Sequence, residues 1–502
     1  MVVAQEFHVL AVLLFALSPA AWANTFEVTP GSDLQGIFDT LAPGTEVILE
    51  DGTYTLTKTL TVTEKNGTED APVVIRAADD ASPVLQLGPD PETDSYADRV
   101  LRIESSNWVE VRGITIQGDQ TASTGRESYG GVRIDASSNV SLVDCKVTEL
   151  PGTGVYLSGD TTGVLIDHTE ISRIYEGYGI YAGASDASAL TTGLLIQNSL
   201  IHDLLGEELQ AVMLNHGTSA TWLIDNVIYN ITHTGVFMGS TEGGEQNRIE
   251  GNAIWNLGNN GLGLQGSVLV RNNIIFNTGG SGIATSDPDR NTFTDVVISY
   301  NTVVDNDGWA ANLQGWDLEE GHILANNALC NPMAYGVYMS KVVPEDTDPD
   351  DIPTPGTVTT NYVCGLVDGL DEELGEVIAG GGYADFENVA LWDFYPDRES
   401  LLIDGADPSG TLYPPEIDFN GIAREGDAPD VGAYEWDGEG NPGWAIQEDF
   451  KDFEIVEETL SESVESGCCS DEGKASESGL LLLPLIGLGA GLRRRRERPD
   501  PA

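Results

Sequence analysis

The chain has 502 residues, enough for several ordinary domains or for one long repetitive β structure. Its 81 acidic residues outnumber 23 basic residues, which gives a formal charge of −58 at pH 7. This charge argues against nucleic-acid binding and is typical of a protein that stays soluble in a salty exterior; it also repels an acidic polysaccharide unless salt or divalent cations intervene.

The first 23 residues have the pattern of an export signal. The apolar stretch “HVLAVLLFALSPAAWA” ends in the small-residue pattern Ala21-Trp22-Ala23, which predicts cleavage after Ala23. Glu6 stands where such signals carry positive charge, but the alternative, a first buried strand, fits poorly with so many Ala and Leu residues. We therefore expect an exported protein that begins at residue 24.

From residue 24 onward, short apolar strands recur with no helical spacing. The middle of the chain contains the blocks LVDCKV, LIDHTEI, LIQNSLI, LIDNVIY, RIEGNAI, LVRNNII, VISYNTV and ILANNAL. At about 26-residue intervals, one shared position holds Cys145, Thr169, Ser199, Val227, Asn252, Asn273, Asn301 and Asn327. A period of this size predicts a solenoid, because each coil is too small to bury a core without its neighbours.

The asparagines at the shared position are expected to form a ladder inside the solenoid. Coils stacked about 4.8 Å apart bring equivalent amides into hydrogen-bonding range. Because Asn tolerates the left-handed conformation, we also expect the ladder residue itself to make the sharp turn. A second polar column follows the next strand and contains Asp203, Asn230, Asn256 and Asn277. The alternative, asparagines in exposed turns of a sandwich, predicts irregular spacing.

These features resemble the right-handed parallel β-helix superfamily, which includes pectate-lyase-like polysaccharide lyases, glycosidases and surface proteins. “LQGIFDTLAPGTEVILEDGTYTLTKTLTV” is similar to the start of such proteins, and “DFNGIAREGDAPDVGAYEW” resembles a terminal motif of bacterial surface members. The resemblance implies an all-β, single-stranded right-handed parallel β-helix solenoid over residues 24–436, with roughly ten or more coils and an N-terminal cap. Fold resemblance alone does not transfer an activity, and the lysine and arginine motifs of chondroitinase-like and alginate-lyase-like members are not found here.

The resemblance places a substrate groove on the outer face of the strand that precedes the ladder strand. Side-chain alternation then predicts an outward column of Arg133, Tyr156, Tyr181, Met213, Phe237, Gly263, Ala284, Asn312 and Tyr338. Its companion column includes Asn215 and Gln265. Rings flanked by amides suit a sugar chain, since C–H faces stack on the rings while hydroxyls find hydrogen-bonding partners. The alternative is that a loop covers the rings.

The loops leading into this stripe hold ionisable groups that are candidates for catalysis: His202, His233, Arg173, Glu176, Glu207 and Glu208. For β-elimination of a uronate, either histidine is a candidate base, and the arginine, or calcium held by the glutamates, would neutralise the carboxylate. For hydrolysis, Glu176 would pair with Glu207 or Glu208 across the bond. Calcium is the one cofactor left open, and no metal ligands are assigned.

The end of the chain changes character after Trp436. Residues 437–466 are acidic and are expected to form a flexible spacer. Residues 467–502 combine a cysteine pair, a short apolar run and an arginine cluster, a layout that resembles the MYXO-CTERM sorting tags. By that resemblance the tag directs delivery to the cell surface or outer membrane through sorting machinery, with the protein then anchored or released. The alternative is a plain membrane tail, and in either case this tail is the only membrane contact expected.

Cys145, Cys330 and Cys364 permit one bridge in the body, and the last two are the nearer pair in sequence. The acidic insert 344–355 is interpreted as a solvated loop rather than a calcium loop. The leading interpretation is a surface-displayed monomer that binds polysaccharide and, if it is an enzyme, cleaves it by elimination or hydrolysis. The competing interpretation is a non-catalytic cell-envelope or adhesion rod, and a calcium-stabilised scaffold is the third.

Overall fold

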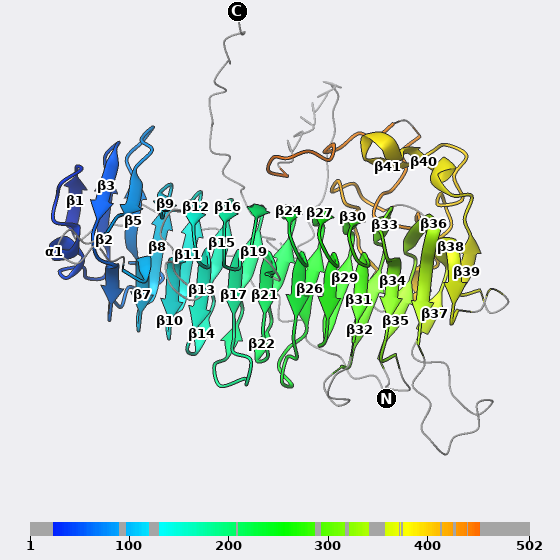
Figure 1. The fold of residues 1–502 in the computed structure, drawn as a ribbon, viewed down its shortest axis with the longest axis horizontal. Helices are drawn as coiled ribbons and strands as arrows, with labels where there is room; N and C mark the ends of the chain where they lie inside the picture. Colours follow the sequence, from blue (N-terminus) through cyan, green and yellow to red (C-terminus); the bar gives the residue numbers. More distant parts are fainter. Residues whose placement is uncertain are drawn as a thin grey trace, which may run out of the picture. The chain divides into compact units, whose positions relative to one another are not determined.

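The computed structural model describes residues 24–89, 97–119, 130–206, 209–286, 293–316, 321–340, 357–370, 372, 375–411, 414–424, 428–438 and 440–451. All of them belong to one compact unit, Trp22–Phe453. The backbone winds through three columns of parallel strands, so the chain is an all-β parallel β-helix, as predicted (Figure 1). The predicted export signal and sorting tag lie outside the described residues, as does the insert 344–355.

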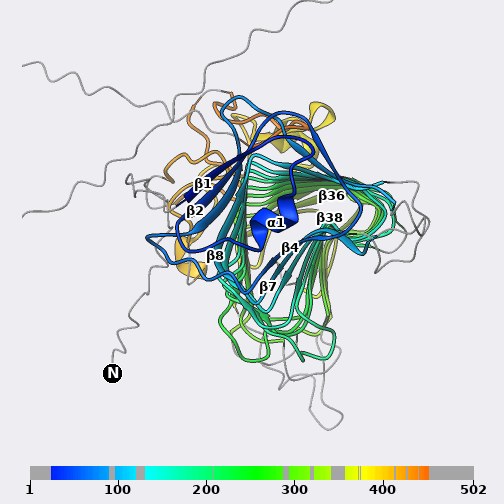
Figure 2. The same ribbon diagram turned by 90° about the vertical axis from the view of Figure 1, so that its left-hand side faces the viewer.

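The three columns are named face 1, face 2 and face 3 in the order in which each coil visits them (Figure 2). Face 1 consists of β4 (Leu60–Thr63), β7 (Arg99–Glu104), β10 (Gly130–Asp135), β13 (Val155–Ser158), β17 (Ile180–Ala182), β21 (Val212–Leu214), β25 (Val236–Met238), β28 (Leu262–Leu264), β31 (Ile283–Thr285), β34 (Trp309–Leu313) and the second half of β36 (Ala328–Met339).

Face 2 consists of β1 (Asn24–Val28), β2 (Thr45–Leu49), β5 (Val73–Ala77), β8 (Asn107–Arg112), β11 (Ser138–Val143), β15 (Leu165–Asp167), β19 (Leu195–Gln197), β23 (Trp222–Ile224), β26 (Asn247–Glu250), β29 (Val268–Arg271), β32 (Val296–Ser299), β35 (Ile323–Ala325) and β37 (Thr357–Thr359). Three two-residue strands extend this sheet: β14 (Thr161–Thr162), β18 (Thr191–Thr192) and β22 (Thr218–Ser219).

Face 3 consists of β3 (Thr53–Leu56), β6 (Val84–Leu87), β9 (Thr115–Gln117), β12 (Lys146–Leu150), β16 (Glu170–Ile174), β20 (Leu200–Leu204), β24 (Val227–Ile231), β27 (Ala253–Leu257), β30 (Ile274–Thr278), β33 (Thr302–Val304), the first half of β36, β38 (Asn361–Asp368) and β39 (Val377–Ala379). Beyond the coils lie the antiparallel pair β40 (Phe386–Asn388) and β41 (Asp393–Pro396), with short 3₁₀ turns at Tyr383–Asp385, Val389–Leu391 and Pro408–Gly410.

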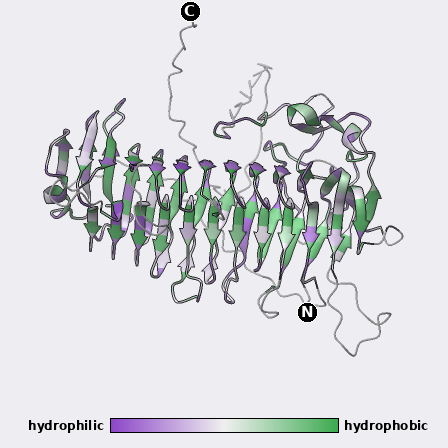
Figure 3. Ribbon diagram, viewed as in Figure 1, coloured by the Kyte–Doolittle hydropathy of each residue, from purple (hydrophilic) through white to green (hydrophobic). Residues whose placement is uncertain are grey.

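The core runs through the middle of the coils and is built by side-chain alternation. Val155 and Leu157 of β13 are fully buried, whereas Tyr156 between them points outward and is half-buried. Apolar residues recur in this way along the stacked strands (Figure 3). The one α-helix in the described part of the chain, α1 (Leu34–Phe38), lies at the amino-terminal end of the stack and buries Leu34 and Phe38 (Figure 2). No helix among these residues has the length and hydropathy needed to cross a membrane.

The predicted asparagine ladder occupies the interior corner between face 2 and face 3. Asn252 Nδ2 donates to Asn273 Oδ1 at 2.9 Å, Asn273 repeats this bond to Asn301 at 2.9 Å, and Asn301 repeats it to Asn327 at 3.0 Å. Each of these oxygens also accepts the backbone N–H of the coil before it. Because all four side chains are fully buried, the ladder is what satisfies their amides, and it continues one coil further to Asn361.

Two details of the ladder differ from the sequence prediction. The rung in the fourth block is Asn226, which donates to Asn252 Oδ1 at 3.0 Å; Val227 is the first residue of β24, so the alignment was shifted by one residue. The left-handed residue is also not the rung but its predecessor, as at Asn272 (φ 54°) and Asn326 (φ 59°). The predecessor bends the chain so that the next side chain points inward, which separates the turning role from the bonding role.

The carboxyl-terminal part of the described chain, residues 380–451, packs back over the outer side of face 3, and we call it the return segment. Its Phe394 and Phe419 join outward rings of face 3 in a second buried apolar cluster. Arg424 is buried and donates to Asn272 Oδ1 at 3.1 Å. Packing continues past the predicted boundary at Trp436, because Lys451 is only 2 % exposed and its Nζ lies 2.6 Å from Asp225 Oδ1.

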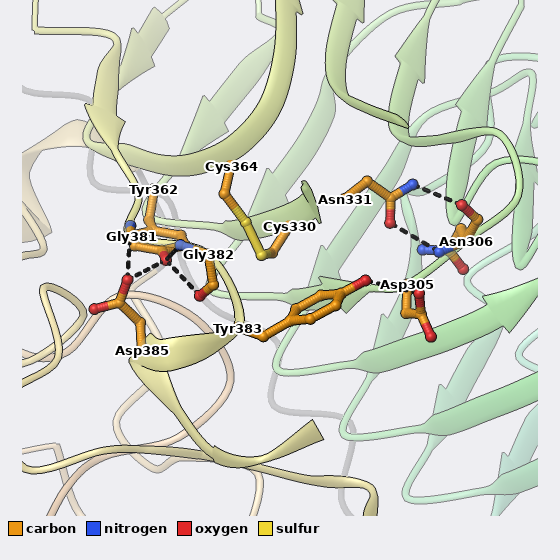
Figure 4. Close-up of a disulfide and its surroundings, with 10 residues drawn as sticks. All are labelled: Asp305, Asn306, Cys330, Asn331, Tyr362, Cys364, Gly381, Gly382, Tyr383 and Asp385. Carbon is orange, nitrogen blue, oxygen red and sulfur yellow. Dashed lines mark hydrogen bonds between the residues drawn. A yellow bond between two sulfur atoms is a disulfide. The ribbon is translucent and has the colours of Figure 1, made fainter. Parts of the chain in front are cut away.

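One disulfide joins the last coils. Cys330 of β36 and Cys364 of β38 occupy paired positions on adjacent strands and are bonded, a bridge that the sequence permits but does not by itself establish (Figure 4). Close by, Tyr383 of the return segment donates its hydroxyl to Asp305 Oδ1 at 2.7 Å. Cys145 is buried as a free thiol at an early rung of the ladder.

The ladder predicts a large stability loss for Asn301→Ala. The substitution removes the acceptor of both the Asn273 backbone N–H and the Asn273 side-chain amide, and it leaves the Val270 carbonyl without its donor. Because buried unsatisfied groups cost about 1–3 kcal/mol each, we expect the free energy of unfolding to fall by at least about 3 kcal/mol. Chemical denaturation, monitored by circular dichroism, measures the free energy of unfolding. Asn312→Ala on the outer side of face 1 is the control, with a loss within about 0.5 kcal/mol; equal effects would contradict the ladder's role.

Candidate functional site

The outer side of face 1 carries one continuous column of side chains. The strand register pairs Arg133 with Tyr156, and it continues through Tyr181, Met213 and Phe237. The same column then runs through Gly263, Ala284, Asn312 and Tyr338. This is the outward column expected from alternation, so its geometry is observed, while its role in binding stays a prediction.

Aromatic rings gather at the first coils of this column. The rings of Tyr156 and Tyr181 lie 5.0 Å apart, and Tyr178, from the turn before β17, lies 5.1 Å from Tyr181. Asn215 is buried in the companion column and donates its amide to the Tyr181 hydroxyl at 2.6 Å, which fixes the ring. The result is a partly exposed platform of rings with a polar edge.

A second group of rings lies at the other end of face 1. Trp309 of β34 lies 5.0 Å from Tyr335 and 5.7 Å from Tyr338, both on β36. The sequence reasoning placed Tyr338 in the column but missed Trp309 and Tyr335. Both residues lie at the position where the coil enters face 1. The sequence could have indicated them, because Tyr178 occupies the same position in the segment “YGIYAG”.

Small residues separate the two groups of rings. A Cβ at Gly263 would lie 3.3 Å from Cδ2 of Phe237, so glycine leaves that ring uncrowded by the next coil. Ala284 follows in the next coil along. Beside them, Gln265 donates its amide to the Ser286 hydroxyl at 3.0 Å. Face 1 therefore joins two groups of rings by a shallow stretch of small and polar residues.

His202 and Arg173 are not brought to these rings. Both were expected in loops that lead into the stripe, but they belong to strands β20 and β16 of face 3. The His202 ring stacks on Tyr229 at 4.9 Å, and its Nδ1 lies 3.0 Å from Asp203 Oδ2. Arg173 forms an ion pair with Glu149 at 2.6 Å. The expectation was wrong because the strands of face 3 extend through these positions before the chain turns.

His233 and Glu176 do lie in turns between face 3 and face 1. His233 Nδ1 is 3.4 Å from Gln210 Nε2, and its Nε2 is 3.0 Å from Asn259 Nδ2. Both ring nitrogens therefore contact amides of adjacent coils, an arrangement suited to holding the turns together. Glu176 is exposed two residues before Tyr178. Glu207 and Glu208 lie outside the described residues, so their pairing with Glu176 stays a prediction.

A further ionisable pair borders the opposite edge of face 1. His216, directly after Asn215, has its Nδ1 3.8 Å from Glu242 Oε1. Across the described ranges, no group of three or more His, Cys, Asp or Glu side chains is placed to hold a metal ion. A calcium site is thus not assigned to any residues, and calcium stays a prediction.

Comparisons with known proteins agree on the fold. A family model for a right-handed β-helix region matches residues 99–266 and 173–341. Pectate lyase Pel9A superposes with a TM-score of 0.50 at 16% identity, over 83% of this chain and 97% of that one. The A-module of mannuronan C-5 epimerase AlgE6 from Azotobacter vinelandii gives 0.44 at 14% identity, over 67% and 88%.

An alginate lyase from Paenibacillus sp. str. FPU-7 gives a TM-score of 0.41 at 15% identity, over 58% of this chain and 97% of that chain. No curated protein matches the chain in sequence. At 16% identity the likeness to pectate lyase Pel9A establishes a shared fold and no activity.

The environment of His202 predicts an acid-sensitive contribution to stability. Burial raises the pKa of Glu170, but hydrogen bonds from His202, Lys146 and Ser172 outweigh burial and hold the pKa at about 2, below its ordinary value of 4.5. A lowered carboxyl pKa stabilises the fold above pH 4.5 and loses that effect as the pH falls toward 2. The contribution is up to about 3 kcal/mol.

We therefore expect Glu170→Gln to lower stability at neutral pH and to flatten the decline between pH 4.5 and 2. Urea denaturation over that range measures both effects. Glu176→Gln, at an exposed position, controls for the loss of one negative charge. An unchanged pH profile in Glu170→Gln would show that the contacts of His202 with its neighbours do not stabilise face 3.

Proposed function

Starting from a chain with the parallel β-helix fold, we propose that it binds an extended polysaccharide along the outer side of face 1. The fold is shared with a pectate lyase, and contact with a polysaccharide is consistent with that likeness. The site consists of the ring platform at Tyr156 and Tyr181, the middle stretch from Met213 to Ala284, and the second group of rings at Trp309 and Tyr338.

The observation that carries the proposal is the alignment of rings in register along one face. Tyr181 and Tyr338 occupy the same column six coils apart, a span of about 29 Å at the usual strand spacing. That length matches several sugar units of an extended chain. Each ring offers an apolar surface to sugar C–H groups, while the partly exposed Gln265 and Asn312 offer amide groups to hydroxyls.

Binding without cleavage is the form of this function that the geometry supports best. Cleavage by elimination or hydrolysis needs a base or two carboxylates within reach of one bond. The four predicted candidates among the described residues are instead divided between two places: His202 and Arg173 lie on face 3, and His233 and Glu176 lie in the turns that precede face 1. The stacking and ion pairing of the first two indicate a structural role.

We also propose export and delivery to the cell surface or outer membrane, by the sequence patterns in residues 1–23 and 467–502. The protein would then present its glycan-binding face as a monomeric rod, in the way an adhesion or envelope protein does. Fractionation of cells that express the full chain, with and without residues 467–502, tests this part separately. Equal recovery of both forms from the soluble interior would refute it.

The rings predict the effect of substitution on binding. Tyr181→Ala and Phe237→Ala should each weaken retention on a glycan by roughly fivefold to tenfold, because each ring contact contributes about 1 kcal/mol. Tyr181→Phe should retain most of the affinity, since it keeps the ring. Affinity electrophoresis in gels that contain soluble polysaccharides measures retention, and assays for reducing ends and unsaturated products run in parallel.

Trp222→Ala is the matched control, because Trp222 is an outward ring in β23 on face 2. It should leave retention unchanged. If Trp222→Ala weakens retention as much as Phe237→Ala does, the binding surface is not face 1. If the parent protein is retained by no glycan, the proposed function fails, and if it generates new ends or unsaturated sugars, the restriction to binding fails.

A further inference from the structure

We infer that the glycan held on face 1 is a neutral polysaccharide and not an acidic one. The inference rests on the proposed function and narrows it to a chemical class of ligand. It comes from the distribution of charge over the molecule, which leaves one long surface without any charged side chain.

The uncharged surface spans eight consecutive coils. The segments that form face 1 in these coils are TGVYLS (153–158), YGIYAG (178–183), QAVMLN (210–215), TGVFMG (234–239), NGLGLQ (260–265), SGIATS (281–286), WAANLQ (309–314) and YGVYMS (335–340). None contains Asp, Glu, Lys or Arg, although 21% of the whole chain is charged. Face 2 of the same coils carries Asp167, Arg248, Glu250 and Arg271.

Two of the three arginines at the near end of face 1, Arg102 and Arg133, are paired with carboxylates, and the third, Arg99, is buried with its guanidinium 5.7 Å from the Tyr156 ring centroid. Arg102 Nη2 lies 2.9 Å from Asp135 Oδ2 and 3.1 Å from Glu104 Oε1. Arg133 contacts the same aspartate at 3.4 Å and donates its Nε to the Ser158 hydroxyl. The two guanidinium groups are thus balanced by two carboxylates, and the guanidinium of Arg133 lies 5.4 Å from the Tyr156 ring centroid.

An acidic polysaccharide would meet an unfavourable surface here. Each carboxylate would lose hydration against rings and small residues without a cation to replace the lost water. The formal charge of −58 adds a repulsion that salt weakens only beyond the Debye length, about 8 Å at physiological ionic strength. A neutral glycan has no such cost.

The polar groups that are present suit hydroxyls instead. Gln265 and Asn312 offer amides and Ser286 offers a hydroxyl along this face, and all three side chains are partly exposed. Amides and hydroxyls both donate and accept hydrogen bonds, as sugar hydroxyls do. The aromatic rings pack against the C–H faces of sugars, and the amides and hydroxyls between the rings bond sugar hydroxyls. Together they form a surface complementary to a chain of uncharged sugars.

A glycan panel tests the class of ligand. The full-length folded chain is run by affinity electrophoresis against soluble β-glucan, galactomannan and xyloglucan as neutral probes, and against polygalacturonate and alginate as acidic probes, each with calcium and with EDTA. We expect retention by at least one neutral glycan, and we expect EDTA to leave that retention unchanged. Between 0.05 and 0.5 M salt the retention should change by less than about twofold, because no ion pairs are formed.

Retention by acidic glycans alone, with or without calcium, would overturn the inference while leaving the proposed function standing. Retention by none of the probes would overturn both. Where a neutral glycan is retained, the double variant Tyr181→Ala/Phe237→Ala should lose at least tenfold in affinity, and Trp222→Ala should lose none; this result would place the glycan on face 1. An unchanged affinity in the double variant would overturn the inference.

A pair of charge insertions separates the two classes of ligand further. Ala284 lies in the middle of the uncharged column, and Ala284→Lys and Ala284→Asp add charges of opposite sign at one position. For a neutral glycan we expect both variants to weaken retention. Their affinities should differ from one another by no more than about threefold, since both substitutions change bulk and hydration in a similar way. A gain with Lys and a loss with Asp, differing by about tenfold or more, would identify an anionic ligand and overturn the inference.

Discussion

The amide ladder at the corner between face 2 and face 3 is the constraint on which the rest of the molecule depends. A strand can slip along its neighbour by one residue only by turning every side chain to the opposite face. The ladder forbids that slip, because Asn273 and Asn301 satisfy each other's buried amides only when the coils are in register. Fixed register at this corner fixes it for the strands on either side, including the column of rings on face 1.

The stretch “VLVRNNIIFN” shows how three asparagines divide the work of one coil. Asn272 takes the left-handed turn, Asn273 points inward as a rung, and Asn277 takes a second left-handed turn at the end of β30. Asn272 has a further role, because its side chain bonds the return segment at Ile417 and Arg424. The turn that shapes the coil therefore also holds the segment that covers face 3.

Much of this could be predicted from the sequence, and each failure has its own physical cause. Alternation and the repeat were enough for the solenoid, its ladder and the outward column from Arg133 to Tyr338, since all three depend on local periodicity. The shift from Val227 to Asn226 arose because the repeat in this coil begins at Trp222, which pairs with Leu195 and Arg248, one residue before the start of the block LIDNVIY. His202 was misplaced because strand β20 of face 3 extends through it, and the packing of residues 437–451 was missed because it depends on coils far earlier in the chain, as in the contact of Lys451 with Asp225.

Face 1 and face 3 each carry an outward row of aromatic side chains, and what covers each row decides its role. On face 3, His202, Tyr229, Trp255 and Phe276 stack nearly parallel, and the last three are buried beneath the return segment. There, rings add to stability. On face 1 the rings are tilted, separated by Gly263 and Ala284, and half-exposed, so their apolar area is not used to close the fold. Exposed apolar side chains gathered on one face mark surfaces for interaction, which favours a ligand as the reason for the rings on face 1.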